Sequence, residues 1–222
     1  MALNLFVGFG ATLLVNWLAD WLPGIGSEKK ITEKRHRGPR WGGLFLVGVL
    51  FAFYRSFPIQ NPESSASVNP WVIWFCFAVF SLILVIDLEH RRVLNIVVYP
   101  MAGVAFALAL WRTDLSLTSA IVGGLVGFGI FLLLYSVRPG ALGAGDVKMA
   151  GLIGLLVGFP GVIVALLSAI TLGGLGAGFL LIFRRVGIRG TMAYAPYLSV
   201  GAMIALLFGQ SIVQWYAGRF GL

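Results

Sequence analysis

The feature that most constrains this chain is a succession of long, uninterrupted apolar runs. Residues 117–137 and 161–183, for example, contain no Asp, Glu, Lys or Arg. A transmembrane helix requires about 20 consecutive, mainly apolar residues, whereas an outer-membrane β-barrel alternates apolar and polar residues along shorter segments. Only 11% of the residues are charged, against about a quarter in an average soluble domain. The sequence therefore predicts an all-α, polytopic membrane protein.

The length rule divides the chain into about eight transmembrane helices, of which the second and sixth are short. Turns rich in Pro and Gly separate several of them. We expect these helices at residues 3–22, 41–55, 71–87, 94–111, 117–137, 145–159, 161–183 and 195–216. Because no internal repeat or soluble domain is recognisable, we expect residues 1–222 to form a single membrane-embedded domain.

Basic residues concentrate in alternate connections between these helices. Thirteen of the 16 Lys and Arg residues lie in or beside the first, third, fifth and seventh connections, including the basic loop 24–40. Only Arg55, Arg112 and Arg219 lie on the other side. Because connections rich in Lys and Arg face the cytoplasm, both termini are expected outside. We attribute the net charge of +8 to this orientation in the lipid bilayer, and expect no nucleic-acid partner.

Two aspartates at the borders of apolar runs are the strongest candidates for a functional site. Asp87 ends the third expected helix and Asp146 begins the sixth. A carboxylate is costly to place near the hydrocarbon core, so an acid at this depth suggests a function. The two helices between them lead out and back, and both side chains are therefore expected at the cytoplasmic border.

Two carboxylates that meet can act as an aspartic catalytic pair. They share one proton, because both cannot ionise cheaply at a separation of about 3 Å. One then activates a water, while the other polarises and protonates the scissile peptide group. Gly143 and Gly145 would allow backbone conformations that a Cβ forbids and let a substrate strand approach Asp146. A simpler alternative is that Asp146 only caps the start of a helix.

Neighbouring polar residues also have more than one interpretation. Lys148 could anchor at the lipid head groups or bias the charge of Asp146. Glu89 could attract a basic peptide segment or be a solvated loop acid. Since the chain has one cysteine, Cys76, and two histidines without a cluster, we expect no metal and no cofactor.

Glycines spaced four residues apart occur on three of the expected helices. In lipid, small residues at this spacing let helix backbones approach closely. We therefore expect these glycines to pack helices together rather than to bind a ligand. The pairs are Gly123 with Gly127, Gly154 with Gly158, and Gly174 with Gly178.

At its aspartates the chain resembles the type IV prepilin leader peptidases, a family of GxGD membrane aspartic proteases related to preflagellin peptidases. The segment 86–90, followed by Asn95, resembles the family's first aspartate motif. The segment 143–148, GAGDVK, matches its GxGDxK motif. The stretch around Pro196 and Tyr197 resembles its last-helix segment. The similarity in helix order and spacing covers most of the chain.

The resemblance implies an aspartic endopeptidase with Asp87 and Asp146 as its catalytic pair. Such an enzyme removes the short basic leader of prepilins or pseudopilins at the cytoplasmic face of the inner membrane. Prepilin or pseudopilin peptides are therefore the implied partners, and self-association into a homo-oligomer is left open. The supporting motif residues that it implies are Gly143, Gly145, Lys148, Glu89, Asn95, Pro196 and Tyr197.

The chain departs from the family in its first connection. Many bacterial members also methylate the new N-terminus, and their first connection carries two CxxC pairs thought to hold zinc. Here that connection, residues 24–40, is short and basic and lacks cysteine. The sequence therefore places N-methyltransferase activity in doubt.

Two other functions fit the same residues less well. A transporter or proton-relay protein would use the acids in series, but a relay needs acids at different depths. An inactive relative that acts only in pilus assembly would be expected to lack a catalytic group, whereas both aspartates are present.

Overall fold

The computed structural model describes residues 70–90, 95–137, 142–182 and 194–221. Within these residues the structure is all-helical, with six helices and no strand. Two of the helices expected from the sequence, 3–22 and 41–55, lie outside the described residues, as does the basic loop 24–40.

The six helices follow the apolar runs of the sequence closely. They are α3 (Pro70–His90), α4 (Asn95–Trp111), α5 (Leu117–Val137), α6 (Ala144–Val157), α7 (Gly161–Ile182) and α8 (Ala195–Phe220). The third expected helix does not end at Asp87 but continues to His90, because Leu-Glu-His contains no helix breaker. Asp87 therefore lies inside the last turns of α3.

Three of the described helices are long and apolar enough to cross a bilayer. They are Leu117–Val137, Gly161–Phe179 and Ala195–Phe220. Large apolar side chains such as Leu125, Leu175 and Phe179 are exposed along them, an arrangement that suits lipid rather than water. These helices indicate a multi-pass membrane protein.

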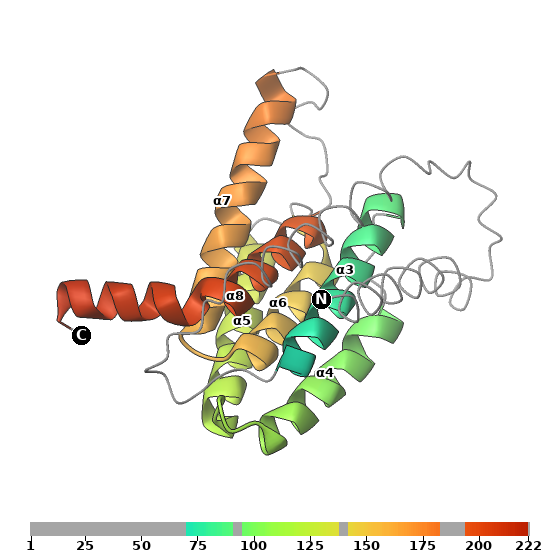
Figure 1. Ribbon diagram of the computed structural model, residues 1–222. Coiled ribbons are helices and arrows are strands. Elements are labelled where there is room, and N and C mark those ends of the chain that lie inside the picture. The colour runs from blue at the N-terminus through green and yellow to red at the C-terminus, as the bar shows by residue number, and fades with distance from the viewer. Residues whose placement is uncertain (1–69, 91–94, 138–141, 183–193, 222) are drawn as a thin grey trace, which may run out of the picture.

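Helices α3 to α6 and the first half of α8 form a bundle (Figure 1). Helix α7 and the C-terminal half of α8 extend beyond it in different directions. Helix α8 packs against α3, α6 and α7, and α6 packs against α4 and α5. The buried core therefore draws on several helices, through side chains such as Phe80, Ile86, Phe131, Met149, Ile153, Leu198 and Met203.

Glycines bring the backbones of α5 and α6 into contact, as expected from their spacing. A Cβ added to Gly123 would lie 2.5 Å from the carbonyl oxygen of Gly154 and 2.7 Å from the carbonyl carbon of Gly158. A Cβ on Gly127 would meet the carbonyl oxygen of Ala150. Because all these neighbours are backbone atoms, the two helices cannot pack this way around larger residues.

The expectation for α7 is wrong in detail. Among the residues that the structure describes, a Cβ on Gly174 or Gly178 would have no neighbour within 4 Å. The glycines that meet another segment are instead Gly173, which contacts Tyr194 just before α8, and Gly176, which contacts Tyr197 in the first turn of α8. All faces of α7 are apolar, so its sequence alone does not determine which face is turned inward.

A buried ion pair closes the end of the bundle where α4 leads into α5. The Arg112 guanidinium donates to Asp114 through Nε at 3.1 Å and Nη2 at 2.5 Å. Its Nη1 donates to the carbonyl oxygen of Leu156 at 2.9 Å, which caps the last turn of α6. The two side chains are only 8% and 6% exposed. The pair thereby ties α4 to the end of α6 that lies farthest from Asp146.

Candidate active site

Asp146 lies in the first turn of α6 and is 7% exposed. Its Oδ2 accepts a hydrogen bond from the backbone N–H of Gly143 at 2.9 Å, and its own N–H donates to the Gly143 carbonyl at 3.0 Å. Gly143 is thus the N-cap and Asp146 stands at the third helical position. The carboxylate caps the helix by reaching back, in the manner of the acidic half of a capping box.

Gly143 is favoured beside Asp146 for a different reason from the one expected. Gly143 has φ −83° and ψ 147°, an ordinary extended conformation, and Gly145 lies within the first turn of α6. Positive φ angles among the described glycines occur at Gly158 and Gly221. A Cβ on Gly143 would lie 3.3 Å from Oδ2 of Asp146. Close approach of the carboxylate, not backbone conformation, therefore favours glycine at position 143.

Asp87 lies near the C-terminal end of α3 and is 4% exposed. The residues before it, Val85 and Ile86, are also buried, whereas Leu88 is exposed. The side chain of Asp87 is therefore on the face of α3 that packs into the bundle. The side chains of Glu89 and His90 lie outside the described part.

A contact between α4 and α6 relates the two aspartate-bearing segments. Lys148 Nζ donates to Oδ1 of Asn95, the first residue of α4, at 3.0 Å. The ammonium also lies 5.0 Å from the ring centroid of Tyr99, within the range of a cation–π interaction. Since α3 ends only a few residues before Asn95, Asp87 and Asp146 lie at the same end of the bundle. Lys148 points across to α4 rather than out to the lipid head groups.

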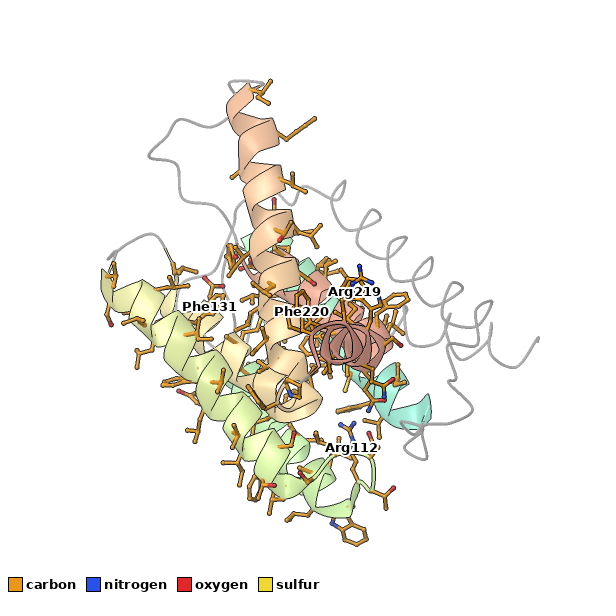
Figure 2. The ribbon with its side chains drawn as sticks, turned by 90° about the vertical axis from the view of Figure 1, so that its left-hand side faces the viewer. Arg112, Phe131, Arg219 and Phe220 are labelled. Atoms are coloured by element: carbon orange, nitrogen blue, oxygen red, sulfur yellow. The ribbon has the colours of Figure 1, made fainter. Side chains whose placement is uncertain are left out.

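The start of α8 closes the bundle near Asp146. Tyr194 precedes the helix, and Pro196 occupies its first turn, where the absent N–H costs nothing. The ring of Tyr194 packs against Gly173, where a Cβ would lie 2.9 Å from Cε2, and Tyr197 packs in the same way against Gly176. Tyr194 is also 5.8 Å, between ring centroids, from Phe131 of α5. Figure 2 shows Phe131 where α5 faces its neighbouring helices.

Burial, and secondarily the negative charge of Asp146, raises the pKa of Tyr194 to about 12. Tyr194 therefore remains a neutral hydrogen-bond donor beside the site at ordinary pH. Its pairing with Gly173 was not expected from the sequence. The sequence does show an aromatic residue, Tyr194, just before a helix whose first turn contains a proline. No feature of the neighbouring sequence indicates which glycine this aromatic ring contacts.

The side chains that most often bind metals are scattered in the described part of the chain. No group of three or more His, Cys, Asp or Glu side chains comes together there. Cys76 is buried within α3 and is a free thiol. The groups that the structure places beside the Asp146 carboxylate are the backbone N–H of Gly143 and the phenol of Tyr194.

Residues 73–178 match the model of the type IV leader peptidase family, and they include both aspartates. Three relatives share the printed name prepilin leader peptidase/N-methyltransferase. The protein of Bacillus subtilis is 24% identical over 68% of this chain and 60% of its own length. That of Aeromonas hydrophila is 29% identical over 61% and 48%, and that of Vibrio cholerae is 29% identical over 74% and 63%.

This chain thus spans between about half and two thirds of the length of these relatives. No solved structure matches it. The family model, which includes the GxGDxK segment, and the names of the relatives nevertheless agree. Over residues 73–178, just under half of its length, the chain is therefore similar to the type IV leader peptidase family.

Proposed function

We propose that this protein is an aspartic endopeptidase that removes the basic leader from prepilin or pseudopilin substrates, with Asp87 and Asp146 as its catalytic pair. The observation that carries the proposal is the burial of both carboxylates, 4% and 7% exposed, at one end of the bundle. The match to the family model supports the proposal, and the names of the relatives supply the substrate class.

The chemistry follows from two carboxylic groups that share one proton. In a site of low dielectric the second ionisation is strongly disfavoured, so one group stays protonated. The ionised group takes a proton from a water as this attacks the scissile carbonyl carbon. The protonated group donates to the carbonyl oxygen, and the amine leaves with a proton from the pair. The two groups titrate as a unit, so neither role is assigned to one aspartate.

The residues around the pair would orient it and admit the substrate. The Gly143 N–H fixes one oxygen of Asp146. Gly143 is itself exposed, and its lack of a side chain leaves room for an extended peptide beside the carboxylate. Glu89 would attract the positive charges of the leader. Tyr197 holds the start of α8 against Gly176 of α7, and Pro196 favours the start of the helix.

The topology we propose is the one expected from the charge pattern. Residues 1–222 would form one membrane domain of eight helices, with both termini outside and the aspartates at the cytoplasmic face of the inner membrane. The excess of Lys and Arg in alternate connections supports this orientation. N-methylation is not part of the proposal, because loop 24–40 contains no cysteine.

The test is cleavage of a membrane-inserted peptide with a basic leader, a glycine and an apolar helix, followed by mass spectrometry. Purified protein in liposomes should release the leader, while Asp87→Asn and Asp146→Asn should each reduce the rate by at least about a thousandfold, since removal of a catalytic group has effects of this order. Asp20→Asn removes another acid near the end of an apolar run and should retain activity.

Ordinary cleavage by either asparagine variant would reject the catalytic pair. Thermal unfolding of both variants should match the wild type, so that loss of activity is not loss of fold. A transporter that used these acids would conduct protons across proteoliposomes without cleaving the peptide. The position of both acids at one end of the bundle does not favour this alternative.

A further inference from the structure

The two helices that carry the aspartates make little direct contact with each other. Within the described residues, α3 packs chiefly against α8, while α6 packs against α4, α5 and α8. The separation of Asp87 from Asp146 is therefore set through intermediate helices. A polar contact that ties α6 near Asp146 to the chain just after α3 would also affect the geometry of the pair.

Lys148 makes such a contact. It stands two residues after Asp146, and its Nζ donates to Asn95 Oδ1 at 3.0 Å across 53 positions of the sequence. Asn95 begins α4, directly after the short connection from α3. The hydrogen bond therefore joins the segment that follows Asp87 to the segment that follows Asp146.

Tyr99 makes the contact more specific. It lies four residues after Asn95, so both side chains project from one face of α4. Its ring centroid is 5.0 Å from the Lys148 ammonium. Lys148 is half-buried, whereas Asn95 and Tyr99 are exposed, so the contact lies at the surface of the bundle. One lysine thus contacts two consecutive turns of α4, which restrains both the separation and the rotation of α4 relative to α6.

The partners of Lys148 argue against a direct chemical role. The ammonium contacts a neutral amide and an aromatic ring, whereas Asp146 accepts its hydrogen bond from Gly143. A lysine that served to lower the charge of Asp146 would be expected to pair with that carboxylate.

We infer that Lys148 is a positioning residue, whose hydrogen bond to Asn95 and contact with Tyr99 hold the helix ends bearing Asp87 and Asp146 at their working separation. This inference rests on the proposed peptidase function. A displacement of about 1 Å at reacting groups can reduce a rate by about a hundredfold. Removal of the contact should therefore lower kcat by about tenfold to a hundredfold with little change in KM.

The first arm of the test is kinetic. Lys148→Met and Asn95→Ala should each lower kcat, and the double variant should be no slower than the more affected single variant, because both remove one interaction. Asn95→Asp keeps an oxygen acceptor and should retain activity. Arg219→Met, which removes a cation from the last turn of α8, is the control for loss of charge. Multiplicative effects in the double variant would overturn the inference.

The second arm measures geometry without requiring cleavage. In a Cys76→Ala background, which removes the chain's single cysteine, nitroxide labels are placed on Leu88→Cys and Ala144→Cys. Both positions are exposed and both aspartates remain. Pulsed electron paramagnetic resonance on the reconstituted protein should give a narrow distance distribution, which Lys148→Met should broaden or shift and Arg219→Met should not.

The two arms separate the inference from the proposed function. If the wild type cleaves no leader peptide, the peptidase proposal fails while the distance measurement still decides whether Lys148 joins the helix ends. If Lys148→Met slows cleavage but leaves the distance distribution unchanged, Lys148 acts on the reaction by another route and the inference is wrong.

Discussion

Replacement of Gly123 by alanine tests whether backbone contact between α5 and α6 stabilises this protein. The new Cβ would lie 2.5 Å from the Gly154 carbonyl oxygen and 2.8 Å from the Gly158 Cα. Ordinary van der Waals contact begins at 3.4 Å, so the helices would have to separate by about 1 Å. Overpacking of this kind costs about 1–3 kcal/mol.

Gly129→Ala is the matched control, because it lies in the same helix and its Cβ would meet no atom of the described residues within 4 Å. Both substitutions gain the helix propensity of alanine, about 1 kcal/mol in water, and this gain cancels in the comparison. Gly123→Ala should therefore be about 1–3 kcal/mol less stable than Gly129→Ala. The assay is reversible unfolding in mixed micelles, followed by far-UV circular dichroism. Equal stabilities of the two variants would refute the close-packing argument.

Two further predictions concern the buried ion pair and Tyr194. Asp114→Ala should lower the free energy of unfolding by about 3 kcal/mol, because it leaves the buried Arg112 charge without its carboxylate. The same unfolding assay should show recovery in the Arg112→Leu/Asp114→Ala double variant, and no recovery would argue against the charge as the cause. Since the pKa of Tyr194 is raised to about 12, its phenol stays neutral up to about pH 10. Tyr194→Phe should therefore leave the alkaline limb of the cleavage rate unchanged between about pH 7 and 10, and a shifted limb would show that Tyr194 titrates there.

The helices were predictable because lipid imposes a local rule. Inside a bilayer every backbone N–H and C=O must be satisfied within the segment, so a long apolar run is sufficient to predict a helix. The bounds of α5, for example, agree with the expectation of 117–137. The family resemblance was also available from local sequence, since GxGDxK is contiguous.

Rotation of the helices was less predictable. The spacing of Gly123 and Gly127 identified the face of α5 that meets α6, but the same rule selected the wrong glycines on α7. On α7 the spacing of glycines does not identify the packed face, because glycines occur on more than one face of the helix. The helix also has no polar face that would set its orientation. The partner aromatic residues of α8 decide which register is used.

The sequence by itself determined that this chain forms apolar helices and that Asp87 and Asp146 occur at costly positions near their ends. Each of these properties depends on the solvation of residues close together in the chain. Only the tertiary structure decided that Lys148 bonds Asn95, 53 positions away, and that Arg112 caps the helix at Leu156, 44 positions away. Such contacts depend on how the helices pack. In lipid, apolar surfaces alone do not determine which helix faces meet, because that choice depends on shape complementarity and a few polar groups.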